Sequence, residues 1–104
     1  MYEVEFKLNE ERVSLKPSLR ALKAVNSSLG SLGRAYAQVA QLDFNAMLLV
    51  IAAGTNKTPK DFEQAVYDNG LGSLVAPLTD FINRLENRGR PIEPTEESEP
   101  TGEA

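Results

Sequence analysis

The stretch Val13–Val25, VSLKPSLRALKAV, changes its hydrophobic period at its centre. Val13 and Leu15 alternate with polar neighbours, as in a β-strand, whereas the following apolar residues recur every three positions and predict one helix face. This predicted face consists of Leu19, Leu22 and Val25. Pro17 removes a backbone donor and ends the strand, and Ser18 is placed to cap the helix. The stretch therefore predicts a strand that leads directly into an amphipathic helix.

A second alternating pattern precedes this stretch. Apolar residues occupy every second position from Tyr2 to Leu8, with charged residues between them, and the turn residues 9–11, Asn-Glu-Glu, lead to Val13 and Leu15. Two alternating runs joined by a short polar turn predict a β-hairpin with one apolar and one charged face. Because a lone hairpin is marginal in water, we expect its apolar face to pack on helices or to pair with another chain's strand.

The remaining sequence predicts about four to five short helices, because glycines and capping residues interrupt it at short intervals. The predicted helices cover 19–29, 32–41, 44–53, a segment from Thr58 to Asn69, and a last segment from about residue 73 to 75 until before Gly89. The third is apolar nearly all round, so we expect it to be the most buried. The predicted fold class is α+β, mainly α: an N-terminal hairpin followed by helices.

Length and charge divide the chain into two parts. The 104 residues are typical of a single domain, which we assign to residues 1–89, followed by a tail, residues 90–104. The last 14 residues, PIEPTEESEPTGEA, contain five acidic and no basic residues, whereas residues 1–90 contain ten acidic and eleven basic ones. Such a segment buries too little apolar surface to offset the entropy of ordering, so we expect a disordered acidic tail. Its role is either that of a solubilising or partner-contacting arm, or none.

The chain contains no cysteine and no histidine. A disulfide framework is therefore excluded, and the commonest metal ligand and the usual general base are absent. Asp61 and Glu63 point to different faces of their predicted helix, and the glycines of SLGSLG and NGLG neither follow an apolar strand nor precede a lysine. We expect no catalytic, cofactor-binding or metal site, and no enzyme activity.

The sequence also predicts a cytoplasmic protein. The longest apolar run, AMLLVIAA at 46–53, is far shorter than the roughly 20 residues that span a bilayer, and the start MYEVEFK is unlike a signal peptide. We therefore expect no membrane partner.

Two surfaces are candidates for binding. The first is a basic patch comprising Arg12, Lys16, Arg20, Lys23 and Arg34. Nucleic acid is a poor partner for it, because the folded part is almost neutral and the tail repels phosphate. The second is an apolar stripe on the last predicted helix: Leu78, Phe81, Ile82 and Leu85. Core packing is its default interpretation, and the alternative is a partner-binding face, because few later elements follow to cover it.

The order of these elements resembles the small tail proteins of the gene-transfer-agent type, found in long-tailed phages and prophages. The resemblance covers about residues 2 to 88 and rests on LKPSLRALKAV, SLGSLGRAYAQV, LDFNAMLLVIAAG, TPKDFEQAV and LGSLVAPLTDFINRL. Asn26 departs from the family, whose members often carry an acidic residue there. The family has been labelled both tail tube protein and tail assembly chaperone. A tube subunit needs a β-rich sandwich or barrel to close rings, so one hairpin favours the chaperone.

The resemblance implies a non-catalytic phage or prophage tail assembly chaperone. Such a protein binds the tape-measure protein and keeps it soluble during tail assembly, with tail tube subunits and a second copy of the chain as further partners. The alternative is a small helical DNA-binding regulator from a mobile element, with TPKDFEQAVYDNGLGSLVAPL as a helix-turn-helix. Its recognition helix would begin SLVAPL, which offers base edges almost nothing to bond.

Overall fold

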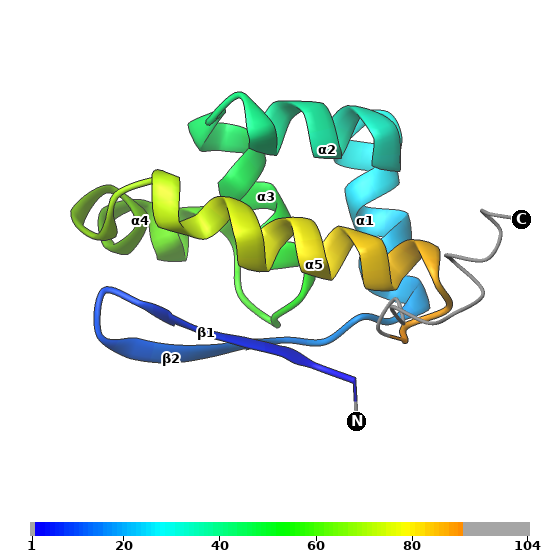
Figure 1. Ribbon diagram of the computed structural model, residues 1–104, viewed down its shortest axis with the longest axis horizontal. Helices are drawn as coiled ribbons and strands as arrows, with labels where there is room; N and C mark the ends of the chain where they lie inside the picture. Colours follow the sequence, from blue (N-terminus) through cyan, green and yellow to red (C-terminus); the bar gives the residue numbers. More distant parts are fainter. Residues whose placement is uncertain (1, 91–104) are drawn as a thin grey trace, which may run out of the picture.

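The computed structural model describes residues 2–90 and shows a two-stranded hairpin packed beneath a layer of helices (Figure 1). The elements are β1 (Val4–Leu8), β2 (Glu11–Leu15), α1 (Leu19–Leu29), α2 (Leu32–Ala40), α3 (Phe44–Ala53), the 3-10 turn η1 (Pro59–Phe62), α4 (Glu63–Asn69), the 3-10 turn η2 (Gly72–Leu74) and α5 (Val75–Glu86). The predicted fold class, α+β and mainly α with an N-terminal hairpin, is confirmed. The prediction of a disordered tail falls on residues 90–104, which lie outside the described residues except for Arg90.

The hairpin is tighter than the sequence suggested. Its strands pair in antiparallel register, with Val4 opposite Leu15 and Leu8 opposite Glu11. The two turn residues, Asn9 and Glu10, have φ angles of 50° and 76°. Positive φ at both central residues is the conformation that suits the right-handed twist of a two-residue hairpin loop. Glu11, which we expected in the turn, is therefore the first residue of β2.

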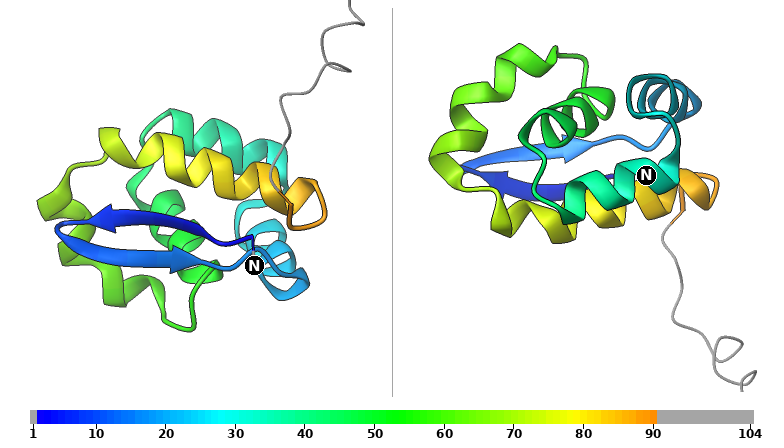
Figure 2. Two further views of the ribbon diagram at one scale, coloured as in Figure 1. Left: turned by 60° about the horizontal axis from the view of Figure 1, so that its bottom comes forward. Right: turned by 90° about the horizontal axis from the view of Figure 1, so that it is seen from above.

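The apolar face of the hairpin packs on the helices, which is one of the two arrangements that the sequence predicted. Val4, Leu8 and Leu15 are buried, and both strands are tied to the helical layer at the open end of the hairpin. The Lys16 N–H donates to the Gly54 carbonyl over 2.8 Å, and the Arg84 guanidinium donates to the Tyr2 carbonyl, also over 2.8 Å. Figure 2 shows the hairpin lying across the helices with α5 along one side.

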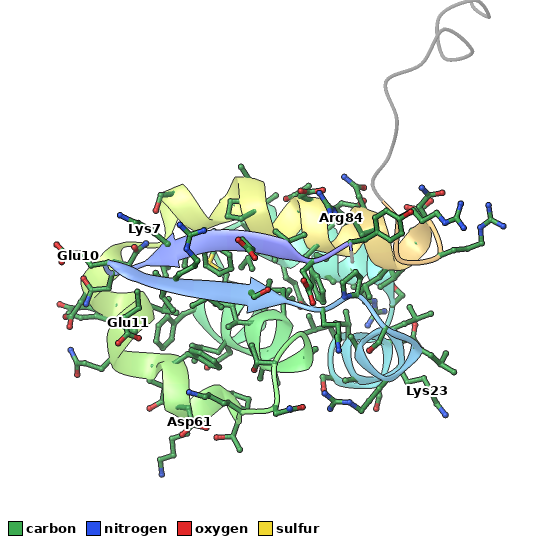
Figure 3. All side chains as sticks on the ribbon, turned by 90° about the horizontal axis from the view of Figure 1, so that it is seen from below. Lys7, Glu10, Glu11, Lys23, Asp61 and Arg84 are labelled. Carbon is green, nitrogen blue, oxygen red and sulfur yellow. The ribbon has the colours of Figure 1, made fainter. Side chains whose placement is uncertain are left out.

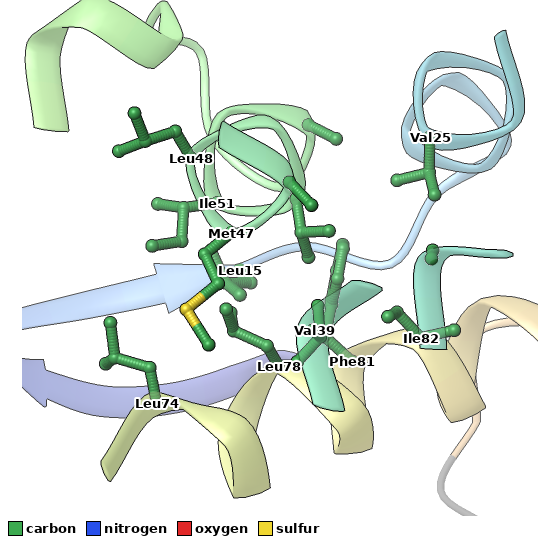
Figure 4. Packing of buried hydrophobic residues seen from close by; sticks show 14 of the residues in the cluster. Leu15, Val25, Val39, Met47, Leu48, Ile51, Leu74, Leu78, Phe81 and Ile82 are labelled. Carbon is green, nitrogen blue, oxygen red and sulfur yellow. The ribbon is translucent and has the colours of Figure 1, made fainter. Parts of the chain in front are cut away.

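Helix α3 is the centre of the core, as its composition predicted. Asp43 caps it, because the Ala46 N–H donates to Asp43 Oδ1 over 3.0 Å. Six of its residues are buried: Ala46, Met47, Leu48, Val50, Ile51 and Ala53. Figure 4 shows Met47 pointing into the same space as Leu15 of β2 and Leu78 of α5. One apolar cluster therefore joins the hairpin to the helices.

Helix α1 begins and ends where predicted, but it buries a different face. Ser18 caps it, since the Ala21 N–H donates to Ser18 Oγ over 3.1 Å. Its buried residues are Ala21, Val25 and Leu29, whereas Leu19 is 70% exposed. Steps of three residues drift around a helix of 3.6 residues per turn, so Leu19 and Val25 lie about 120° apart, while steps of four stay close to one line. The predicted face of Leu19, Leu22 and Val25 was therefore wrong at its first member.

The predicted helix from Thr58 to Asn69 is divided into η1 and α4. Its start was predicted correctly, because the Thr58 N–H and hydroxyl donate to Asp61 Oδ2 over 2.8 and 3.0 Å. Helix α2 ends at Ala40, one residue before the predicted end, and α3 has the predicted bounds.

Candidate binding surface

The apolar stripe of α5 lies inside the core. Leu78, Phe81 and Ile82 are 0% exposed and Leu85 is 6% exposed. Elements that precede α5 in the chain cover it, because α2, β1 and α1 all contact it, and Figure 4 shows Leu78 and Phe81 beside Val39 of α2. The folded domain therefore presents none of Leu78, Phe81 and Ile82 to a partner, Leu85 reaches only the wall of a surface hollow, and core packing accounts for the stripe.

Two polar side chains of α5 are also engaged within the domain. Arg84 pairs with Asp80, with Nε and Oδ1 3.1 Å apart, and donates to the carbonyls of Tyr2 and Glu3. In the helix-turn-helix alternative α5 would be the recognition helix. Its single arginine is committed to these internal contacts, which leaves little on this helix that could bond to a base edge.

The most exposed apolar side chains among residues 2–90 lie elsewhere. Four large ones are exposed: Tyr2 at 43%, Leu42 at 46%, Leu19 at 70% and Tyr67 at 75%. Leu19 differs from the others because it stands between two hollows. One follows α1 and is lined by Leu19, Arg20, Lys23, Ala24, Ser27 and Ser28; we call these six residues the α1 surface.

The second hollow lies where α1 begins and α5 ends. It has a volume of about 250 Å³, and its lining includes Pro17, Leu19, Leu22, Leu85, Arg88 and Gly89; we call it the Pro17 hollow. Gly89 lies close against Pro17, since a Cβ at this glycine would be only 3.1 Å from the Pro17 carbonyl oxygen. The α1 surface and the Pro17 hollow meet at Leu19, so together they form one apolar strip with cationic edges.

The cations predicted as one basic patch are only partly together. Arg20 is held beside the loop after α3, because its guanidinium donates to the Thr55 carbonyl over 3.2 Å and to Asn56 Oδ1 over 3.0 Å. Lys16, Arg20 and Lys57 line one polar groove there, together with the carboxylate of Glu3. Arg12 instead pairs with Glu5 on the outer face of the hairpin, 3.1 Å away.

Lys23 and Arg34 also take different positions. Lys23 points outward from α1 (Figure 3) and lines the α1 surface together with Arg20. Arg34 lies against Gly30, at the far end of α1 from Arg20. The positive charge is therefore concentrated at the first half of α1 and the loop beside it.

The shifted pKa values of two titratable groups have structural causes. Hydrogen bonds from the backbone N–H of Thr58 and then from its hydroxyl hold the pKa of Asp61 below its ordinary value. Burial, and secondly the negative charge of Glu86, raise the pKa of Tyr36. Within residues 2–90, no three histidine, cysteine or acidic side chains come together in a way that could hold a metal ion.

The sequence alone did not single out the α1 surface. Leu19 was assigned to the same helix face as Leu22 and Val25, and the available signal against this was the three-residue spacing, whose drift takes the first leucine away from the core. In the part of the chain that the structure describes, no helix has both the length and the hydropathy to cross a membrane. No protein-family model, curated protein or solved structure matches the chain.

Proposed function

We propose that the protein is a non-catalytic tail assembly chaperone of a phage or prophage, which acts in the host cytoplasm by binding the tape-measure protein and keeping it soluble. The observation that carries this proposal is the exposed apolar strip at Leu19, which is 70% exposed at the junction of two hollows. The sequence resemblance over about residues 2 to 88 supplies the family context. The small helical domain with one hairpin agrees with the chaperone label better than with that of a ring-forming tube subunit.

The strip is suited to an amphipathic helix of a partner. An apolar helix face that would otherwise aggregate packs on Leu19, Leu22 and Ala24, while carboxylates flanking that face pair with Arg20 and Lys23. Each exposed ion pair contributes only about 0–1 kcal/mol, and apolar contact adds about 25 cal/mol per Å² buried. A surface of this modest size binds reversibly, which a chaperone requires because it must leave before the tail is complete.

Co-expression with the tape-measure protein tests the proposal, using the very long open reading frame expected just downstream of this gene. The wild-type chain should raise the soluble fraction of that protein and co-purify with it. Leu19→Glu should abolish both effects, because it places a charge at the centre of the strip. It should still fold, since an acidic residue in the first turn of a helix is favourable.

Tyr67→Glu is the matched control, because Tyr67 is also a large exposed side chain, at 75%, but lies on α4. This variant should retain binding. The proposal fails if the tape-measure protein is equally soluble with and without the chain and does not co-purify with it. Tight DNA binding that weakens steeply with salt in a mobility-shift assay would instead favour a DNA-binding regulator.

A further inference from the structure

The α1 surface and the Pro17 hollow have a one-sided charge. Their linings include the cations Arg20, Lys23 and Arg88 and no carboxylate. Leu19, in the middle, is an apolar side chain that water contacts over 70% of its area. The chemistry that complements this strip is therefore an apolar side chain accompanied by several carboxylates.

The described chain ends beside this strip. Gly89 lines the Pro17 hollow together with Leu19, and the Arg90 guanidinium lies over the Tyr2 ring, 6.0 Å from its centroid. Residue 91 therefore follows within two positions of the hollow. The last described residues, Gly89 and Arg90, therefore lie at the edge of the strip.

The sequence of residues 91–104 has the complementary chemistry. The segment PIEPTEESEPTGEA contains five glutamates, no cation and one large apolar residue, Ile92, close to its start. Fourteen residues reach at most about 46–50 Å when extended, whereas the eleven residues of α1 extend over only about 16 Å. The segment is long enough to follow the whole α1 surface.

We propose that residues 91–104 occupy the α1 surface of the same molecule, with Ile92 against Leu19 and the glutamates beside Arg20 and Lys23. The tether gives the segment an effective concentration in the millimolar range, so weak contacts suffice. Because the charges are exposed, the contact is screened by salt. The inference concerns contacts within this chain and does not depend on the proposed function.

A spin label on the segment tests this in the full-length protein. The chain has no cysteine, so Ser98→Cys provides the single site for a nitroxide, and the amide signals of α1 report its proximity. Signals from Leu19 to Ser28 should be attenuated at about 0.01 M salt. Most of this attenuation should be lost at about 1 M salt, where the Debye length falls from about 30 to about 3 Å.

Charge reversal separates docking from mere tethering. Because the segment is joined to Arg90, its spin label attenuates some nearby signals in every variant, whether or not the segment is docked. Docking is therefore judged from the difference in attenuation between variants. Lys23→Glu should reduce the attenuation along α1, as should Ile92→Ser, whereas Lys60→Glu, the same charge change on η1, should leave it as in the parent protein. Equal attenuation in the Lys23→Glu and Lys60→Glu proteins, or attenuation that salt does not change, overturns the proposal.

A mixed sample identifies the molecule that supplies the segment. Spin-labelled chains without isotope are combined with isotope-labelled chains without a nitroxide. Docking within one molecule predicts no attenuation in this mixture. Attenuation of the α1 signals there would make a second copy of the chain the occupant and would overturn the contact in cis.

Discussion

Helices α1 and α5 both carry apolar residues at helical spacing, but the exposure of these residues differs between the two helices. The stripe of α5 is buried, with Phe81 at 0% exposure, whereas α1 leaves Leu19 70% exposed. Both helices are amphipathic, and they lie next to each other where α5 ends and α1 begins, since Leu85 and Leu19 line the same hollow. The difference therefore does not come from composition.

The contrast comes from what each helix packs against. Helix α5 is the last element, yet β1 lies along it and α2 contacts it from the helical layer (Figures 1 and 2). Helix α1 contacts α2, α3 and α5 through the line of Ala21, Val25 and Leu29, and its remaining face meets solvent. Position in the chain is thus a poor guide to exposure, because elements that precede the last helix in the sequence can cover its apolar face.

The largest expected effect on stability concerns the buried stripe of α5. Phe81→Ala should lower the free energy of unfolding by about 3–5 kcal/mol, because it leaves a large cavity in a fully packed site. Leu19→Ala is the matched test on α1. It should change the free energy of unfolding by no more than about 0.5 kcal/mol, as substitutions at exposed positions generally do. Urea unfolding followed by circular dichroism measures both. Similar costs for the two variants would remove the distinction between the helices.

A second test concerns the closest packing behind α5. A Cβ at Gly54 would lie 2.8 Å from the Leu15 Cβ and 3.0 Å from Phe81 Cζ. Gly54→Ala should therefore destabilise the protein by about 1–3 kcal/mol through overpacking. Gly72→Ala is the control, because nothing lies within 4 Å of the added carbon there. An unchanged urea midpoint for Gly54→Ala would show that Gly54 is packed less closely against Leu15 and Phe81 than the structure describes.

Local signals in the sequence predicted the elements well. The bounds of α1 and α3 follow from their caps, Ser18 and Asp43, and from the glycines that end them, Gly30 and Gly54. A cap acts on backbone groups within three residues, so its effect can be recognised from a short stretch of sequence. The division of the fourth predicted helix into η1 and α4 was missed, although its capping residues were recognised.

The candidate site could not be predicted in the same way. The burial of Leu78 and Phe81 depends on β1 and α2, which lie at least 35 residues away in the sequence. The exposure of Leu19 depends on which face of α1 packs against α3. The three-residue spacing predicted the face that contains Leu19, whereas the buried face contains Ala21, Val25 and Leu29. Burial is decided by contacts between distant segments, which local patterns describe only indirectly.

A smaller effect is expected at the start of α1. Ser18→Ala should cost about 1 kcal/mol, because it removes the acceptor for the Ala21 N–H while leaving the exposed face of the helix unchanged. Ser28→Ala, at an exposed position of the same helix, should be neutral or slightly stabilising, since alanine has the higher helix propensity. Coincident denaturant midpoints for Ser18→Ala and the wild type would mean that Ser18 does not act as the cap.

The smallest effect is expected from removing residues 91–104. If this segment covers the α1 surface, its contacts are exposed ion pairs of about 0–1 kcal/mol each, and the entropy lost on ordering the segment reduces their net contribution further. The thermal midpoint should therefore fall by less than about 4 °C, the shift that roughly 1 kcal/mol produces in a domain of this size. Scanning calorimetry of the chain ending at Arg90, at low and at high salt, measures the difference, which should vanish at high salt as the charges are screened. A drop that approached the effect of Phe81→Ala would make the segment part of the stabilising core, and α1 would then be as thoroughly covered as α5.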